Sequence, residues 1–248
     1  MANAKDSIGL PGGGAFPSTH WTVIRQAGTR GSPSYVTAIN TLCRLYWKPV
    51  YGYIRVARAS AAEEAKDLTQ EFFSGLVEGD FLKRYAPDRG SFRSYLRGAV
   101  HLFLLESHRK ASAQKRGGSR KFLTLEGEDA GFIERLCSTP GVSPEEAFER
   151  QWAKSVMDLA VEDLRKELME SGKETYFRVF EKYHLDRPSD EKVSHESVAK
   201  EFSMKPTDVN HYLAHCRLRL RELLVNRIRE TVDDEKDISS ELMRIVSS

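Results

Sequence analysis

Two neighbouring segments of opposite charge, both with the periodicity of an amphipathic helix, most constrain the fold of this 248-residue chain. In the first segment, from Ala62 to Glu78, apolar residues recur at helical spacing and form one stripe: Ala65, Leu68, Phe72 and Leu76. Acidic residues lie off this stripe: Glu63, Glu64, Asp67 and Glu71. The pattern predicts a helix with one face in a core and an acidic face outside.

The second segment, from Ser91 to about Lys115, is predicted to be a basic helix. It follows a break at Gly79–Asp80 and Pro87–Gly90, and Ser91 is its candidate N-cap. The predicted apolar face consists of Phe92, Leu96, Ala99, Phe103 and Leu104. Arg93, Arg97 and His101 stand four apart, so they form a separate basic stripe. Such a stripe suits a polyanion, most simply nucleic acid, although the solvated faces of an ordinary bundle explain the charge alone equally well.

Composition narrows the class of protein. A formal net charge of +2 does not by itself indicate a nucleic-acid-binding protein, and 40% hydrophobic residues favour small helical cores over one large core. The three cysteines are odd in number and far apart, which argues against a disulfide scaffold and fits a reducing cytoplasm. No apolar run approaches the roughly 20 residues of a membrane span, and the start of the chain lacks a signal-peptide pattern. We therefore expect a cytoplasmic protein without a membrane partner.

The expected fold class is all-α, with two small helical domains joined by an acidic linker. The predicted boundaries are a disordered leader at 1–17, a first domain at 18–116, a linker at 117–142, a second domain at 143–230 and a tail at 231–248. In the linker only Phe132–Leu136 is expected to be helical, because acidic residues, glycine and proline dominate the rest. In the first domain Pro49 is expected to kink or restart a helix whose inward residues begin with Val36.

The second domain contains a helix-turn-helix pattern. Ser194 is predicted to cap a short helix to Phe202, a tight turn follows at Ser203–Pro206, and Thr207 is predicted to cap a longer helix. The inward residues of that helix are Val209, Leu213, Cys216, Leu220 and Leu223. Its exposed side carries groups that can contact base edges and phosphates: Asn210, His211, His215, Arg217, Arg219 and Arg221. The pattern indicates DNA binding, although generic helix-turn-helix patterns are common.

Three motifs, taken in order, give a more specific indication. They are Asp-Leu-Thr-Gln-Glu-Phe-Phe at Asp67–Phe73, Gly-Ser-Phe-Arg-Ser-Tyr-Leu at Gly90–Leu96, and a helix-turn-helix that ends at Arg217–Leu224. Over about Ser18 to the C-terminus the chain resembles an extracytoplasmic-function (group four) sigma factor of bacterial RNA polymerase. This family belongs to the sigma-70 superfamily and has regions 2 and 4 without a region 3 domain. The start Pro17–Trp21 and the tail further resemble a subgroup from planctomycetes and related bacteria.

The resemblance implies promoter recognition and DNA-templated transcription initiation, not enzyme activity. In region 2 the acidic helix would dock on the clamp helices of the largest polymerase subunit through Glu63, Asp67, Gln70, Glu71 and Phe72. The loop 79–90 would accept a flipped base of the minus-ten element, and the neighbouring DNA contacts would be Arg89, Arg93, Arg97, His101, His108 and Arg109. Region 4 would also hold the polymerase flap, and it would read the minus-thirty-five element with Lys205, Thr207, Asn210, His211, His215, Arg217 and Arg219.

One departure and one alternative accompany this resemblance. Asn210 and His215 stand where relatives usually carry lysine and arginine, which predicts a weaker phosphate grip by region 4. The alternative function is a plain helix-turn-helix regulator whose N-terminal domain binds a partner or effector, although such a protein has no need of the Asp67–Phe73 surface. The sequence leaves open whether an anti-sigma protein is a further partner.

Metal and cofactor chemistry is the weaker interpretation. Glu181 and His184 have the Glu-x-x-His spacing of di-iron bundles, but the matching second pair is missing from the sequence. His211 and His215 stand next to Cys216, yet Cys216 belongs to the predicted inward stripe, so core packing and DNA contact are favoured over zinc. The sequence has no Gly-rich phosphate loop, nucleophile elbow or His-Glu-x-x-His motif. We expect no cofactor and no metal.

Overall fold

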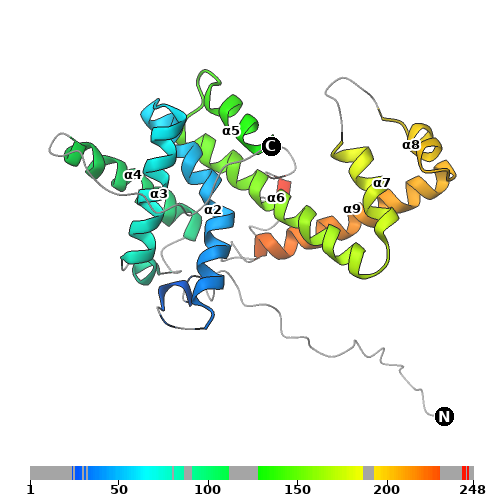
Figure 1. The fold of residues 1–248 in the computed structure, drawn as a ribbon, viewed down its shortest axis with the longest axis horizontal. Helices are drawn as coiled ribbons and strands as arrows, with labels where there is room; N and C mark the ends of the chain where they lie inside the picture. Colours follow the sequence, from blue (N-terminus) through cyan, green and yellow to red (C-terminus); the bar gives the residue numbers. More distant parts are fainter. Residues whose placement is uncertain are drawn as a thin grey trace, which may run out of the picture.

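The computed structural model describes residues 24, 26–29, 31, 33–79, 81–86, 91–111, 128–186, 193–229, 242, 243 and 245. These residues form an all-helical fold without a strand, as predicted (Figure 1). The elements are α2 (Tyr35–Arg58), α3 (Ala62–Glu78), a 3-10 turn (Leu82–Arg84), α4 (Phe92–Ala111), α5 (Glu128–Cys137), α6 (Pro144–Glu170), α7 (Glu174–His184), α8 (His195–Glu201) and α9 (Pro206–Arg229). The predicted leader, the turn at Pro87–Gly90 and most of the predicted tail lie outside the described residues.

The long helix α2 is the centre of the first hydrophobic cluster. Its buried side recurs at helical spacing and includes Ile39, Leu42, Tyr46 and Ile54. The helix continues through the buried Pro49, so the predicted restart there is wrong. Proline removes one backbone hydrogen bond, but close packing of the turns on both sides keeps the helix intact. Val36 is 65% exposed rather than inward, because it lies in the first turn, beyond the edge of the cluster.

The predicted linker is more ordered than expected where it is described. Residues 128–137 form α5, whose Ile133 is buried in the first cluster. Tyr51 of α2 donates a hydrogen bond to Glu134 at 2.7 Å, and Arg55 pairs with the same carboxylate at 3.0 Å. These contacts order a helix that glycine and acidic composition disfavour locally, because tertiary packing outweighs helix propensity. The stretch 117–127 lies outside the described residues.

Helix α6 belongs to both hydrophobic clusters. Phe148, Trp152 and Val156 in its first half pack with α2, α3 and α4, whereas Leu164 and Leu168 in its second half pack with α7, α8 and α9. Figure 1 shows α6 running from the group of α2 to α5 toward the group of α7 to α9. The boundary between the clusters therefore falls inside α6 and does not coincide with the domain start predicted at residue 143.

The helix-turn-helix pattern is confirmed in its geometry. Ser194 caps α8 through a reciprocal capping box with Ser197, with backbone-to-hydroxyl distances of 3.1 Å in both directions. The turn that follows places Ser203 at a positive φ of 53° and closes with a Met204 N–H to Ala199 carbonyl bond of 2.9 Å. Val198, Ala199, Val209 and Leu213 bury the contact between α8 and α9. The short helix is thus held at a fixed angle to the long one.

Helix α9 starts two positions earlier than predicted. The helix begins at Pro206, so Thr207 lies inside it and is not the N-cap. Proline is well suited to the first helical position because its φ is fixed and it has no N–H to satisfy. Asp208 accepts the N–H of Lys205 at 3.3 Å and completes the helix start.

The capping box gives a first stability prediction. Ser194→Ala removes the hydroxyl that accepts the N–H of Ser197, so it is expected to lower the free energy of unfolding by about 1 kcal/mol. Ser194→Asp retains an N-cap acceptor and should lose much less. Urea denaturation of both variants measures the difference, and equal stabilities for the alanine variant and the parent would show that the cap contributes nothing.

All three cysteines are free thiols, which agrees with the predicted absence of a disulfide scaffold. Burial raises the pKa of Cys43, Cys137 and Cys216 to about 11, so these thiols stay protonated at neutral pH. Among the described residues, no helix combines the length and apolarity needed to span a membrane.

Candidate functional site

The acidic residues of α3 form an exposed row. Glu64, Asp67 and Glu71 are separated by three and four positions, so they lie on one side of the helix, opposite the buried Ala65, Phe72 and Leu76. Within the described part of the chain, none of these three carboxylates makes an ion pair. We call Glu64, Asp67 and Glu71 the acidic row.

The other predicted polymerase contacts of α3 are placed differently. Glu63 is exposed and pairs with Lys66 at 2.8 Å, and Gln70 is half-buried. Phe72 is buried, with its ring centroid 5.6 Å from Phe73 and 5.5 Å from Phe103. Its assignment as a surface contact is therefore wrong, because its ring already lies in the core. Its position on the apolar stripe was the sequence signal for that burial.

Two of the three residues in the predicted basic stripe of α4, Arg93 and Arg97, pair with a carboxylate of α6, whereas His101 is exposed. The Arg93 side chain is only 11% exposed, with its Nε 3.3 Å from Glu149. Its guanidinium carbon lies 4.0 Å from the centroid of the Trp152 ring, in a cation–π arrangement. Arg97 donates to the same Glu149 carboxylate at 2.9 Å. The expectation that Arg93 projects into solvent is wrong in this structure, because Glu149 and Trp152 of α6 lie against its side chain. Arg97 remains partly exposed, at 34%, while it pairs with Glu149.

The third member of the stripe, His101, takes part in the same arrangement through a tyrosine. The Tyr53 hydroxyl lies 3.3 Å from His101 Nδ1 and donates to Glu145 at 3.3 Å. Burial raises the pKa of Tyr53 to about 12, so the hydroxyl remains a donor at neutral pH. Glu145 and Glu149 are four apart on α6 and thus match the spacing of the α4 stripe. We call the contact of Arg93, Arg97 and His101 with Tyr53, Glu145 and Glu149 the α4–α6 seam.

Several predicted contacts of α4 lie beyond the seam or beyond the described residues. His108 is exposed near the end of the helix. Arg89 and the side chain of Arg109 lie outside the described residues. Exposed apolar residues on the same half of α4 are Leu102 and Leu105. This half of α4 therefore presents apolar as well as polar side chains to solvent.

On α9, exposed residues follow one side of the helix. They recur at helical spacing and are Thr207, Asn210, His211, Ala214, Leu218 and Arg221, which we call the α9 outer face. Lys205 is also exposed, in the turn before the helix. The predicted DNA contacts Thr207, Asn210 and His211 are thus brought together at the N-terminal end of the helix, where a helix-turn-helix presents side chains to a groove.

Two other predicted contacts of α9, His215 and Arg217, have neighbours within the protein. His215 is half-buried, with its ring 5.2 Å from that of Tyr176 in an edge arrangement. Arg217 is exposed, but its Nε donates to His184 Nε2 at 3.2 Å. Arg217 thus lies at the edge of the α9 outer face, and His215 packs against α7.

Arg219 is a structural residue rather than a surface contact. Its guanidinium pairs with Glu167 of α6 at 2.7 Å and with Glu222 at 2.5 Å. These hydrogen bonds, first that with Glu167, raise the pKa of Arg219 above its usual value. The assignment to DNA contact is wrong for this structure, since Arg219 points from α9 toward α6. The alternating arginines of the motif did not indicate which of them faces the neighbouring helix.

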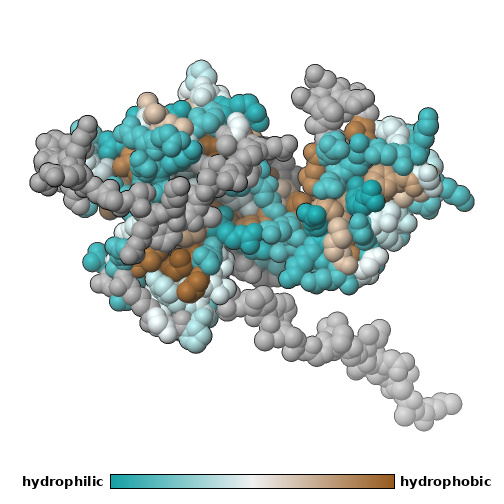
Figure 2. All heavy atoms as spheres, in the orientation of Figure 1, coloured by the Kyte–Doolittle hydropathy of each residue, from teal (hydrophilic) through white to brown (hydrophobic). Residues whose placement is uncertain are grey.

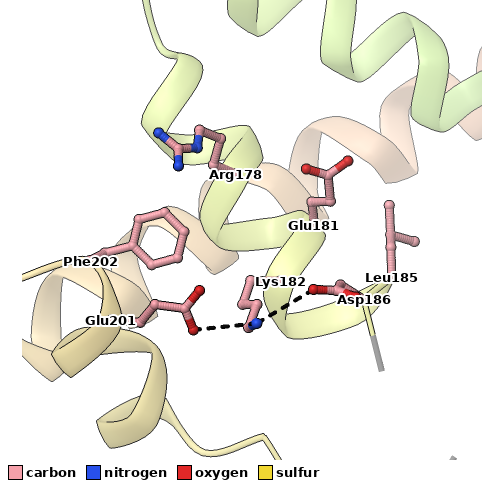
Figure 3. Close-up of a pocket in the computed structure, with 7 residues that line it drawn as sticks. All are labelled: Arg178, Glu181, Lys182, Leu185, Asp186, Glu201 and Phe202. Carbon is pink, nitrogen blue, oxygen red and sulfur yellow. Dashed lines mark hydrogen bonds and ion pairs between the residues drawn. The ribbon is translucent and has the colours of Figure 1, made fainter. Parts of the chain in front are cut away.

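A shallow polar hollow lies between α7 and α8 (Figure 3). It is lined by Arg178, Glu181, Lys182, Leu185, Asp186, Glu201 and Phe202. Lys182 pairs with Asp186 and with Glu201, each at 3.4 Å, so the central cation is neutralised within the protein. The ion pairs of Lys182 therefore link α7 to α8, the first helix of the helix-turn-helix. The face of the molecule in Figure 2 is predominantly hydrophilic, with apolar residues gathered in small separate areas.

No metal-ligand cluster is formed by the described residues. Glu181 lines the polar hollow, while His184 accepts the Arg217 hydrogen bond. The Cys216 thiol is buried and donates to the Tyr176 carbonyl at 3.5 Å, which directs it away from the outer face. Its predicted place on the inward stripe is confirmed.

Comparison with known proteins found no matching protein-family model, no matching curated protein and no matching solved structure. A function must therefore be inferred from the surfaces described above and from the sequence motifs.

Proposed function

We propose that this protein is a sigma factor of bacterial RNA polymerase that binds the core enzyme and directs it to promoter DNA. The observation that carries the proposal is the acidic row of α3. Three carboxylates are exposed side by side without an ion pair in the described structure, and two of them, Asp67 and Glu71, belong to the Asp67–Phe73 motif. Unpaired like charges repel one another, so such a row favours a basic partner surface. The polymerase clamp helices are the partner that the motif implies.

The second half of the proposal is promoter recognition by α9. Its outer face presents Asn210 and His211 beside Thr207, on a helix whose opposite side is anchored by Val209 and Leu213. Asparagine binds adenine through two hydrogen bonds, and histidine can contact base edges or phosphates. We assign upstream duplex recognition to this face, and contact with the minus-ten element to the polar side of α4. The flap contact and any anti-sigma partner belong to the same proposal.

A pull-down with purified bacterial core RNA polymerase tests the proposal directly. The full-length protein is expected to bind core and to support initiation from a promoter in its presence. A plain regulator would instead bind a duplex tightly and specifically at physiological salt without polymerase. Failure to bind core, combined with such independent binding, would reject the sigma-factor assignment.

The two proposed DNA surfaces should fail differently when they are mutated. Asn210→Ala with His211→Ala is expected to weaken promoter recruitment and relax upstream sequence preference, because a bidentate base contact contributes about 1–3 kcal/mol. Arg97→Ala with His101→Ala should allow closed complexes but reduce opening, seen as lost permanganate reactivity of unpaired thymines. Arg93 is left intact because its side chain is more buried than that of Arg97, 11% against 34% exposed.

A pre-melted promoter provides the control for this comparison. It should largely rescue the Arg97 and His101 variant and leave the Asn210 and His211 variant impaired. Identical defects, neither of them corrected by pre-melting, would contradict the assignment of separate promoter elements to α4 and α9.

A further inference from the structure

Two histidines lie on consecutive turns of α9, beside the start of α7. His211 is exposed on the α9 outer face, and His215 is half-buried one turn further along the helix. Their ring centroids lie 6.0 Å and 5.2 Å from that of Tyr176, respectively. Tyr176 is itself stacked on Tyr212 at 3.9 Å, which fixes the position of this cluster. The two histidines therefore form one edge of the face to which we assign DNA recognition.

The permanent cations along this part of α9 are committed to neighbours. Arg219 pairs with Glu167 and Glu222, and Arg217 donates a hydrogen bond to His184. From its start as far as residue 218, the α9 outer face otherwise consists of neutral side chains: Thr207, Asn210, Ala214 and Leu218. The charge of this stretch therefore depends on the two histidines.

The other charged groups near the histidines do not neutralise them. The Lys173 ammonium lies 5.8 Å from the centroid of the Tyr176 ring, on the side of α7. Asp208 stands one turn before His211, but it accepts the backbone N–H of Lys205 at 3.3 Å. Arg219 stands one turn after His215 and carries its own carboxylate partners.

Neither His211 nor His215 forms a hydrogen bond or an ion pair within the part of the chain that the structure describes. A protonated imidazole at either position thus lacks an anionic partner in the described structure. A DNA phosphate placed along the outer face would supply one, because an opposite charge at short distance favours the charged form of a titratable group. Phosphate binding and protonation are therefore expected to support each other at this edge of α9.

We propose that protonation of His211 and His215 strengthens the binding of DNA to the α9 outer face, so that this binding is regulated by pH. The inference rests on the proposed function, which assigns duplex DNA to this face. Histidine is the side chain that changes charge between about pH 5 and pH 8. By linkage, DNA that favours the charged rings is itself bound more tightly when the rings are protonated. The added affinity is present at the acidic end of this range and is lost as the pH rises.

Three variants test the linkage. His211→Gln with His215→Gln removes both titratable rings and keeps polar side chains at the two positions. His211→Lys gives the exposed position a permanent positive charge. His195→Gln is the matched control, because His195 belongs to α8 of the same helix-turn-helix, with its ring 5.1 Å from that of Tyr183 and not beside Tyr176.

Fluorescence anisotropy of the full-length proteins with a labelled DNA duplex measures affinity at about pH 5.5 and about pH 8. The parent and His195→Gln are expected to bind about 10-fold or more tightly at the lower pH. The double glutamine variant retains the exposed His101 and His108 of α4, so its gain should fall below about 3-fold rather than vanish. His211→Lys should bind more tightly than the parent at the higher pH and depend less on pH.

Two further readouts identify the cause of the effect. The slope of log affinity against log salt concentration should steepen by about 1–2 for the parent at the lower pH, since each added phosphate contact contributes about 0.9. NMR titration of the imidazole signals should show higher midpoints for His211 and His215 when DNA is bound, with no change for His195. Far-UV circular dichroism at both pH values checks that the fold is retained.

The outcomes separate the linkage from the proposed function. Equal pH dependence in the parent and the double glutamine variant would reject the linkage, and so would absence of DNA binding at both pH values, whatever the polymerase pull-down shows. If affinity and midpoints respond as stated while core polymerase does not bind, the linkage stands and the sigma-factor assignment fails. Should the double glutamine variant unfold, an unchanged pH dependence of His211→Lys would still reject the linkage.

Discussion

Asp67→Arg with Glu71→Arg is expected to weaken binding to core RNA polymerase by at least about 100-fold, because like charges brought together at an interface cost several kcal/mol. Both side chains are exposed and make no ion pair in the described structure, so their replacement leaves the core untouched. Surface substitutions of this kind usually change stability by less than about 0.5 kcal/mol. The far-UV circular dichroism spectrum and the unfolding midpoint should therefore match those of the parent protein.

A control with the same change in net charge separates a local contact from a general electrostatic effect. Glu170→Arg with Glu174→Arg alters two exposed acids at the junction of α6 and α7, away from α3. This variant should bind core like the parent. Fluorescence titration of labelled protein with core polymerase measures all three affinities, and an unchanged affinity for the α3 variant would reject α3 as the docking helix.

Local rules predicted the helices of this protein well. The apolar stripe of α3 predicted that Ala65 and Phe72 are buried and that Asp67 and Glu71 are exposed, and the structure agrees. The cap at Ser194 and the turn after Phe202 were likewise readable, since both depend on side chains within a few residues of the backbone groups that they satisfy. Helices, caps and turns that depend on residues close together in the sequence can thus be predicted without knowledge of the tertiary fold.

Contacts between distant residues were not recoverable in this way. The spacing of Arg93 and Arg97 shows that they share one side of α4, but it cannot show that Glu149, 52 positions beyond Arg97, covers that side. The same limit explains Arg219, whose partner Glu167 is also 52 positions away. A polar stripe on a helix is compatible with solvent, a ligand or a second helix, and only tertiary packing decides among them.

The extent of the first hydrophobic cluster could not be predicted from the sequence for a related reason. Proline and acids after Ser143 mark a helix start correctly, and Ser143 does cap α6 through the Glu146 N–H at 3.1 Å. The start of a helix does not by itself fix the start of a domain, because the first half of α6 packs on the preceding elements. Phe148 and Trp152 are fully buried there, and both residues were available in the sequence as a signal of a long inward-facing stretch.

Trp152→Ala is expected to lower the free energy of unfolding by about 3–5 kcal/mol, the range for removing a large buried aromatic side chain. Trp152 is 0% exposed, and the guanidinium carbon of Arg93 lies 4.0 Å from the centroid of its ring. Its loss leaves a cavity between α6 and its neighbours. It also removes the aromatic ring that packs against the partly buried Arg93 guanidinium. Trp152→Phe keeps an aromatic ring in the first cluster and should lose considerably less.

The same variant tests whether the two hydrophobic clusters unfold together. Helix α6 is one continuous helix with Trp152 in the first cluster and Leu168 in the second. A destabilising substitution in either cluster should therefore shift one unfolding transition that both clusters share. Leu168→Ala, expected to lose about 2–5 kcal/mol, is the matched change in the second cluster. Urea unfolding followed by circular dichroism, with hydrogen exchange resolved by helix, compares the two. If Trp152→Ala destabilised only α2 to α6 and Leu168→Ala only α7 to α9, the chain would consist of two independently folding domains, as its sequence alone predicted, and α6 would join them without coupling their stability.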